Sequence, residues 1–167
     1  MAETPALVLI GAPGAGKTRI GKRIARLLDP PFVDTDKRVV ALPGSIPDIF
    51  ERYGEPHFRV LEREQVALAL AENAVVALGG GAVLDEGTQA DLAALKVAQL
   101  TVSPESIATR NIGAGRPLLS GGIDAWTALV AARAPIYDRL SQASFDTSRL
   151  PAERIADDIV RWLEETP

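Results

Sequence analysis

The chain has 167 residues, of which 47% are hydrophobic and 24% are charged, and its net charge at pH 7 is −4. This length suits one domain with its own core, and the acidic balance argues against binding nucleic acid through a basic face. Because there is no cysteine, disulfides and thiolate metal sites are excluded, and oxygen ligands or the single His57 would hold any metal. We expect a soluble, cytoplasmic protein, since neither a secretory signal nor a long apolar run is present.

The first motif is a phosphate loop at residues 11–18, which reads Gly-Ala-Pro-Gly-Ala-Gly-Lys-Thr and fits G-x-x-x-x-G-K-[ST]. It follows an apolar run at 7–10 and precedes the spacing of an amphipathic helix. Lys17 would contact the β- and γ-phosphates of ATP, and the Thr18 hydroxyl would coordinate Mg²⁺. The residues predicted here to bind the nucleotide are Gly11, Gly14, Ala15, Gly16, Lys17, Thr18 and Arg19.

Short apolar runs alternate with helical patterns along the chain. The predicted strands are 7–10, 32–33, 74–78, 97–102 and 144–146. Their nearly continuous hydrophobicity is typical of a parallel sheet that is covered on both faces. We predict a single α/β domain, residues 1–167, with a central five-stranded parallel sheet and helices on both faces.

Helical patterns fill the intervals between the strands. A short helix should end at Gly54, and a longer one should run from about 56 to 72. Further helices are predicted at 104–110, 126–140 and 151–165, and the glycine-rich stretch 111–122 has the composition of a loop over a site. In the longer helix, Phe58, Leu61, Gln65 and Leu68 are predicted to share one face. Trp126 and Trp162 are predicted as core, and His57 as an ordinary helix residue.

Polar residues and glycines follow two of the predicted strands, where the ligands of such a fold gather. Asp34 and Asp36 come directly after the second strand, so that one could hold Mg²⁺ through water while the other orients or deprotonates a hydroxyl. Without a phosphate loop, a solvated turn with an N-cap aspartate would be the better interpretation. Gly79-Gly80-Gly81 ends the third strand and permits close approach of a ligand, although a flexible turn is the alternative.

Four arginines extend the candidate site. Arg59 begins a helix, Arg110 ends another, Arg116 lies in the glycine-rich loop and Arg133 lies inside the late helix. A guanidinium binds a carboxylate or phosphate through two parallel hydrogen bonds. We predict that Arg59 and Arg133 hold an anionic substrate and that Arg116 neutralises the transferred phosphoryl group, whereas each alone would be interpreted as a surface side chain.

Seven segments form an ordered set: 11–18, Asp34-Thr35-Asp36, 44–50, Gly54-Glu55 with Phe58-Arg59 and Glu62, Gly79-Gly80-Gly81, Arg116-Pro117-Leu118-Leu119, and Arg133-Ala134-Pro135-Ile136-Tyr137. In this order and spacing they resemble shikimate kinase over nearly the whole chain. A phosphate loop is common to many kinases. The combination of Phe-Arg-x-x-Glu, the triple glycine and Arg-x-Pro-x-Tyr is specific to that family.

The resemblance implies transfer of phosphate from ATP to the 3-hydroxyl of shikimate, in the biosynthesis of chorismate and the aromatic amino acids. It implies Lys17, Asp36 and Arg116 as catalytic residues, with Asp36 as base, and Asp34 as support for Mg²⁺. It further implies a monomer with a substrate-binding region at about 34–62 and a lid at about 111–122. The implied substrate contacts are Asp36, Phe50, Phe58, Arg59, Gly80, Gly81 and Arg133, with both arginines on the carboxylate, and the implied adenine pocket contains Arg110, Arg149 and Pro151.

The chain departs from the family pattern in a shorter segment between Arg110 and Arg116 and in a loose match around 146–151. Two other functions remain open. A different small-molecule kinase, such as a gluconate kinase, would keep the phosphate loop but would not need arginines on both sides of a carboxylate. A nucleotide-binding module without transfer activity would lack a catalytic group, yet Lys17, Thr18, Asp36 and Arg116 are all present.

Overall fold

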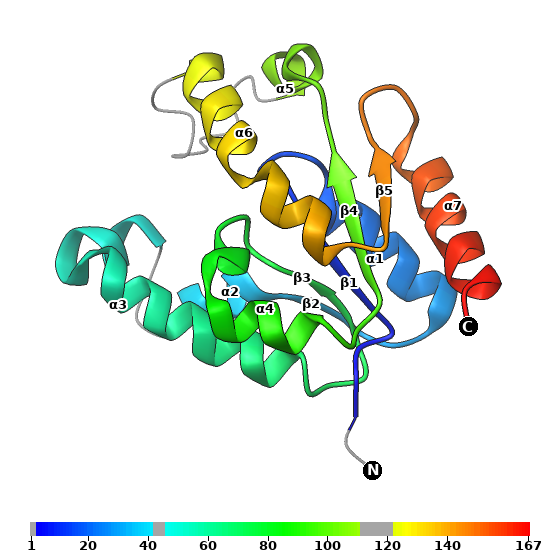
Figure 1. Cartoon of the computed structure of the whole chain (residues 1–167), viewed down its shortest axis with the longest axis horizontal. Coiled ribbons are helices and arrows are strands. Elements are labelled where there is room, and N and C mark those ends of the chain that lie inside the picture. Colours follow the sequence, from blue (N-terminus) through cyan, green and yellow to red (C-terminus); the bar gives the residue numbers. More distant parts are fainter. Residues whose placement is uncertain (1–2, 42–45, 111–121) are drawn as a thin grey trace.

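The computed structural model describes residues 3–41, 46–110 and 122–167. Its central sheet has the strand order β2-β3-β1-β4-β5, and every neighbouring pair is parallel (Figure 1). The strands are β1 (Leu7–Gly11), β2 (Phe32–Asp34), β3 (Val75–Ala77), β4 (Val97–Thr101) and β5 (Ala143–Asp146). The predicted five-stranded parallel sheet is confirmed, and each strand end lies within one residue of its predicted position.

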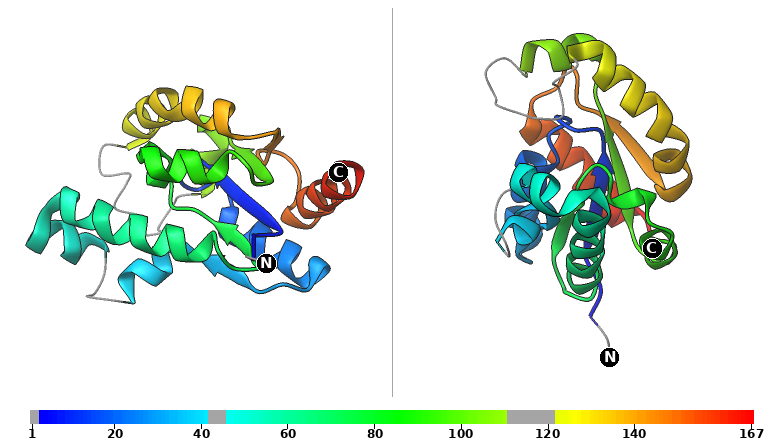
Figure 2. Two further views of the ribbon diagram at one scale, coloured as in Figure 1. Left: turned by 60° about the horizontal axis from the view of Figure 1, so that its bottom comes forward. Right: turned by 90° about the vertical axis from the view of Figure 1, so that its left-hand side faces the viewer.

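Helices cover both faces of the sheet, as predicted (Figure 2). Alternation along β1 explains why its sequence is apolar throughout, since Leu7 and Leu9 pack with α1 and α7 while Val8 and Ile10 pack on the face of α3, α4 and α6. The helices are α1 (Lys17–Leu28), α2 (Thr35–Val40), α3 (Ile46–Ala69), α4 (Glu86–Leu92), α5 (Pro104–Arg110), α6 (Gly122–Leu140) and α7 (Ala152–Glu165), with a 3₁₀ turn η1 (Ala82–Leu84).

Helix α3 consists of two helical segments that meet at Gly54. This glycine has φ 83° and ψ 167°, which breaks the helix, and Pro56 begins the next turn. The predicted break is confirmed. Of the residues predicted to share one face, Phe58 is buried and Leu61 packs beside it, but Leu68 is 60% exposed, whereas Glu62 and Val66 are buried. The buried face includes the charged residue Glu62, and the apolar pattern therefore predicted a face that is displaced by about one residue.

No helix was predicted at α2, η1 or α4, and all three are short. An aspartate caps the start of both α2 and α4. The Asp34 carboxylate accepts hydrogen bonds from the amides of Asp36 and Lys37, and the Asp85 carboxylate accepts one from the amide of Thr88. Each has seven residues or fewer, which is too short to show a clear helical periodicity of apolar residues. The two tryptophan predictions hold, since Trp126 is 1% exposed and Trp162 packs against the same core.

The carboxyl ends of β1, β2 and β3 bring the phosphate loop, the aspartate pair and the triple glycine to one edge of the sheet. Where β1 enters the phosphate loop, Gly11 pairs with Leu100 of β4. A Cβ atom on Gly11 would stand 2.2 Å from the carbonyl oxygen of Leu100, so only glycine fits there. Within the described residues, none of the helices is both long and apolar enough to cross a bilayer.

Candidate active site

The phosphate loop joins β1 to α1 through backbone conformations that favour glycine. Gly11, Gly14 and Gly16 have φ of 141°, 83° and 97°. Gly16 directly precedes α1 and offers no side chain to cap it, which leaves the first amides of the helix facing the loop. Lys17 turns back over the loop, where its Nζ donates to the carbonyl oxygens of Gly11 at 2.6 Å and Ala12 at 3.1 Å. The glycine conformations and the uncapped start of α1 are the features through which a loop of this kind binds an anion.

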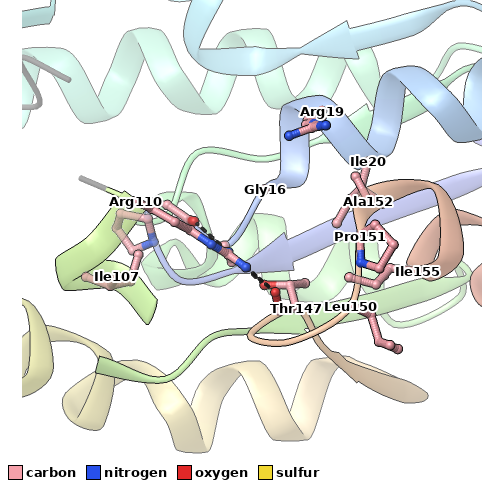
Figure 3. Close-up of a pocket in the computed structure, with 13 residues that line it drawn as sticks. Gly16, Arg19, Ile20, Ile107, Arg110, Thr147, Leu150, Pro151, Ala152 and Ile155 are labelled. Atoms are coloured by element: carbon pink, nitrogen blue, oxygen red, sulfur yellow. Dashed lines mark hydrogen bonds between the residues drawn. The ribbon is translucent and has the colours of Figure 1, made fainter. Parts of the chain in front are cut away.

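A cavity of about 500 Å³ lies beside this loop (Figure 3). The phosphate loop, α1, α5, the segment before α7 and the first turns of α7 form its walls, and a volume of this order suits a small-molecule ligand. The lining residues are Pro13, Gly14, Ala15, Gly16, Arg19, Ile20, Ile107, Arg110, Thr147, Leu150, Pro151, Ala152 and Ile155.

Most residues predicted to bind the nucleotide base and phosphates meet at this cavity. Arg110 crosses its mouth, where Nη1 donates to Thr147 Oγ1 at 3.1 Å and to the carbonyl of Gly14 at 3.4 Å, and Nη2 donates to the carbonyl of Thr147 (Figure 3). Arg19 lines the cavity with an exposed side chain, 3.9 Å from the carboxylate of Glu153. Pro151 lines it too, but Arg149 is exposed and is not among the lining residues, so its role stays a prediction.

The Thr18 hydroxyl and the Asp34 carboxylate, which are predicted to hold magnesium, lie side by side. Thr18 Oγ1 donates to Asp34 Oδ2 at 3.0 Å, while Asp34 Oδ1 accepts from the amides of Asp36 at 3.0 Å and Lys37 at 3.3 Å. Asp34 is therefore both the N-cap of α2 and a neighbour of the phosphate loop, so the two interpretations of this residue are compatible. Hard oxygen donors of this kind fit Mg²⁺.

Asp36 stands in a partly buried position between the two loops. Burial raises the pKa of its carboxyl group, and the nearby Asp34 carboxylate raises it further, while Lys17 and Arg59 oppose the shift by lowering it. A carboxylate with a raised pKa is a stronger proton acceptor than an ordinary aspartate.

Each residue of the triple glycine faces a different side chain of the predicted substrate site. A Cβ atom on Gly79 would stand 2.2 Å from Asp36 Oδ1, and one on Gly81 would stand 2.6 Å from Arg59 Nη1. A Cβ atom on Gly80 would stand 3.2 Å from Arg133 Nη1. The loop is therefore glycine because a carboxylate and two guanidinium groups pack directly against its backbone, and the flexible-turn alternative does not explain this match.

The two arginines reach the loop from different helices and differ in their partners. Arg59 Nη1 donates to Glu62 Oε1 at 2.6 Å, and its guanidinium lies 5.3 Å from the ring centre of Phe58. Arg133 is 8% exposed, and its Nη1 has no hydrogen-bond partner among the described residues. An unpaired buried donor is costly, so Nη1 needs an acceptor beyond the described residues, and a ligand carboxylate would supply one.

Glu62 balances the positive charge beneath this site. It is 4% exposed, and burial raises the pKa of its carboxyl group although the hydrogen bond and charge of Arg59 lower it. The two aromatic rings predicted to contact the substrate, those of Phe50 and Phe58, lie 4.8 Å apart between ring centres. Arg116 and the lid predicted at 111–122 lie outside the described residues except for Gly122, as do Gly44 and Ser45.

Sequence reasoning assigned no role to several polar residues that the structure places at the site. Thr147 binds Arg110, Glu62 binds Arg59, and the Tyr137 hydroxyl donates to the carbonyl of Gly80 at 2.7 Å. Thr35 is fully buried, where its Oγ1 accepts from the amide of Gly79 at 3.2 Å and donates to the carbonyl of Ala77 at 3.4 Å. Glu62, Thr35 and Tyr137 belong to segments of the resemblance, which was the available signal.

Replacing Thr35 with valine should lower the free energy of unfolding by about 1–3 kcal/mol, because the Gly79 amide would stay buried without an acceptor. Valine keeps the shape of the side chain, so the loss of stability measures the contribution of the hydroxyl group. Chemical denaturation measures it, and Thr35→Ser, which keeps the hydroxyl, should recover most of the stability. Equal losses for both variants would contradict the hydrogen-bond explanation.

Comparisons with known proteins agree with this geometry. The family model for shikimate kinase matches residues 13–164. The chain belongs to the shikimate kinase family. A shikimate kinase of Thermobifida fusca is 44% identical over 98% of this chain and 97% of the relative, and one of Salinispora tropica is 43% identical over 95% and 98%.

Solved structures of shikimate kinases share the fold. A structure of the Acinetobacter baumannii shikimate kinase in complex with shikimate has a TM-score of 0.90 and 28% identity, covering 97% of this chain and 93% of that one. The Aquifex aeolicus shikimate kinase has a TM-score of 0.81 and 31% identity, covering 95% of each chain. The predicted enzyme class, a shikimate kinase that uses ATP, is confirmed.

Proposed function

We propose that the enzyme transfers the γ-phosphoryl group of ATP to the 3-hydroxyl of shikimate, with Asp36 as the proton acceptor. The observation that carries this proposal is the triple glycine, against which Asp36, Arg133 and Arg59 each pack at one residue. This arrangement sets a proton acceptor and two carboxylate-binding groups around one space, next to the phosphate loop. A cyclic acid with ring hydroxyls has the matching groups.

The transfer breaks one bond and forms another. The hydroxyl oxygen of the acceptor bonds to the γ-phosphorus, the bond from that phosphorus to the β,γ-bridging oxygen breaks, ADP leaves, and the hydroxyl proton goes to Asp36. The raised pKa of Asp36 supports its role as acceptor. Lys17 lies over the phosphate loop, where its charge can stabilise the developing charge between the β- and γ-phosphates.

Thr18 and Asp34 would hold Mg²⁺, with the phosphates and water as the remaining ligands. Within the described residues there is no group of three or more histidine, cysteine, aspartate or glutamate side chains that could hold a metal, and magnesium in kinases is commonly bound by few protein groups. When bound, the ion neutralises charge on the phosphates. The nucleotide itself would occupy the cavity lined by Arg110 and Pro151.

Three further assignments belong to the same proposal. The region 34–62 would bind the acceptor, since it holds Asp36, Phe50, Phe58 and Arg59 around the triple glycine. A cytoplasmic location and a monomeric state are proposed because the chain belongs to the shikimate kinase family. The catalytic role of Arg116 stays a prediction from the resemblance.

Replacing Arg133 with lysine should weaken shikimate binding about ten- to a hundredfold while ATP affinity hardly changes. An ammonium group keeps the charge but cannot form two parallel hydrogen bonds to a carboxylate. Calorimetric titration of each ligand into wild type and variant measures both affinities. Arg139→Lys is the matched control, because this exposed arginine of the same helix binds only Gln89 among the described residues.

Equal losses for both ligands, or no loss for shikimate, would reject the carboxylate contact. A coupled kinase assay over a panel of hydroxy acids tests the acceptor independently. Activity on a sugar acid in preference to shikimate would favour the gluconate-kinase alternative, and nucleotide binding without transfer to any acceptor would favour the inactive module.

A further inference from the structure

The indole of Trp126 joins helix α6 to the phosphate loop. This tryptophan is 1% exposed, and its Nε1 donates to the carbonyl oxygen of Pro13 at 2.9 Å. It shares a core cluster with Ala12 and Ala15, two other residues of the loop. The hydrogen bond therefore fixes one point of the loop beside the nucleotide cavity, which Pro13 lines.

We propose that Trp126 is a positioning residue, which holds the Pro13 carbonyl and thereby keeps the amide of Gly14 directed at the phosphates of the nucleotide. The inference rests on the proposed function, in which the nucleotide occupies this cavity. It assigns the indole N–H a function through the phosphate loop and not through contact with a ligand.

The planar peptide between Pro13 and Gly14 links the tryptophan to the phosphate site. This peptide bond is trans, so its C=O and N–H groups point in opposite directions. A donor that fixes the direction of the carbonyl therefore also fixes the direction of the amide. Gly14 lines the cavity, and its amide makes no hydrogen bond within the described part of the chain. The amide is thus available to a phosphate oxygen, as in other glycine-rich anion-binding loops.

This peptide needs an external constraint because glycine restrains it little. Gly14 has φ of 83°, and a glycine passes readily from such a conformation to a negative φ. Rotation of the peptide plane changes this φ together with the ψ of Pro13, and it would turn the amide away from the cavity. The next carbonyl, that of Gly14, accepts from Arg110 Nη1 at 3.4 Å. Trp126 and Arg110 therefore hold the two peptides that flank this glycine.

The first test is Trp126→Phe, which removes the indole N–H and keeps an aromatic side chain. We expect the affinity for ADP to fall about tenfold, as for the weakening of one hydrogen bond to a charged group. The affinity for adenosine should stay within about twofold of wild type, because adenosine carries no phosphate. Calorimetric titration measures the affinity for ADP, and inhibition of the kinase reaction measures that for adenosine.

Trp162→Phe is the matched control variant. Trp162 packs against the same core as Trp126 and contacts the Phe145 ring edge-on, but it makes no hydrogen bond to the phosphate loop among the described residues. The substitution removes the same atoms from the side chain. It should lower thermal stability and leave the ratio of the two affinities, for ADP and for adenosine, as in wild type.

A second test keeps Trp126 and so avoids the loss of packing. In the Trp162→Phe protein Trp126 is the only tryptophan, so its indole N–H gives a single NMR signal in a tryptophan-labelled sample. A phosphate that accepts from the Gly14 amide polarises the peptide and strengthens the bond from the indole to the Pro13 carbonyl. We expect ADP to move this signal downfield and adenosine to leave it in place.

The outcomes separate this inference from the proposed function. An unchanged affinity for ADP in Trp126→Phe, equal losses for ADP and adenosine, or an indole signal that ADP moves no more than adenosine does would each reject the positioning role. Transfer of phosphate to shikimate by wild type would still support the proposed function. If Trp126→Phe does not fold, the NMR comparison decides. If ADP binds Lys17→Met as tightly as wild type, the proposed place of the phosphates is rejected together with this inference.

Discussion

Replacing Lys17 with methionine should leave a folded protein in which phosphoryl transfer is about 10²- to 10³-fold slower. The expected loss follows from the position of Nζ, which lies over the phosphate loop within 2.6 Å of the Gly11 carbonyl. A fixed positive charge at this place stabilises charge that develops between the β- and γ-phosphates, and methionine of similar length supplies none.

The measurement is kcat in a coupled assay that detects ADP, beside circular dichroism to verify the fold. Lys22→Met is the matched control, because this lysine lies on the same helix with an exposed side chain away from the loop. It should retain wild-type kcat. If Lys17→Met kept full activity, the phosphate loop could not serve the reaction proposed here.

Replacing Asp36 with asparagine should lower kcat about 10²- to 10⁴-fold and leave ATP affinity unchanged. The amide has nearly the shape of the carboxylate and can still contact a hydroxyl, but it is a poor proton acceptor. Steady-state kinetics with calorimetric titration of ATP separates the two effects. An unchanged kcat would remove Asp36 from the role of proton acceptor.

The same variant should be more stable than wild type at neutral pH. The pKa of Asp36 is raised in the folded protein, chiefly by burial and then by Asp34, so its ionised form opposes folding. Folded wild type binds more protons than the unfolded chain between the unfolded and folded pKa values, and stability falls as pH rises through that interval. Thermal melts of both proteins should therefore diverge above the folded pKa and converge in acid; parallel melting curves at every pH would contradict this.

The sheet could be predicted from the sequence because parallel strands that are covered on both faces are apolar at nearly every residue. Leu7 to Ile10 are all apolar, since alternate residues pack into two different cores. The phosphate loop and the break at Gly54 were predictable for a similar reason, as each needs glycine at a defined place.

Other features depend on partners that are distant in sequence. The buried face of α3 includes Glu62, whose burial is tolerated because Arg59 binds it, and no apolar pattern marks such a residue. Thr35 binds the amide of Gly79, 44 residues away, and Tyr137 binds the carbonyl of Gly80, 57 residues away. Such contacts are fixed by the tertiary fold, so local sequence signals could only suggest that these residues matter.

One side chain packs against each glycine of the loop 79–81, and this packing limits how the acceptor specificity of the enzyme can change. A Cβ atom at Gly79 or Gly81 would stand 2.2 Å from Asp36 Oδ1 or 2.6 Å from Arg59 Nη1, so a single substitution there moves that side chain from its place at the site. A change of acceptor specificity at this loop therefore requires the glycine and its opposing residue to change together. Mutational libraries that vary both positions of a pair should yield functional variants that single-position libraries miss.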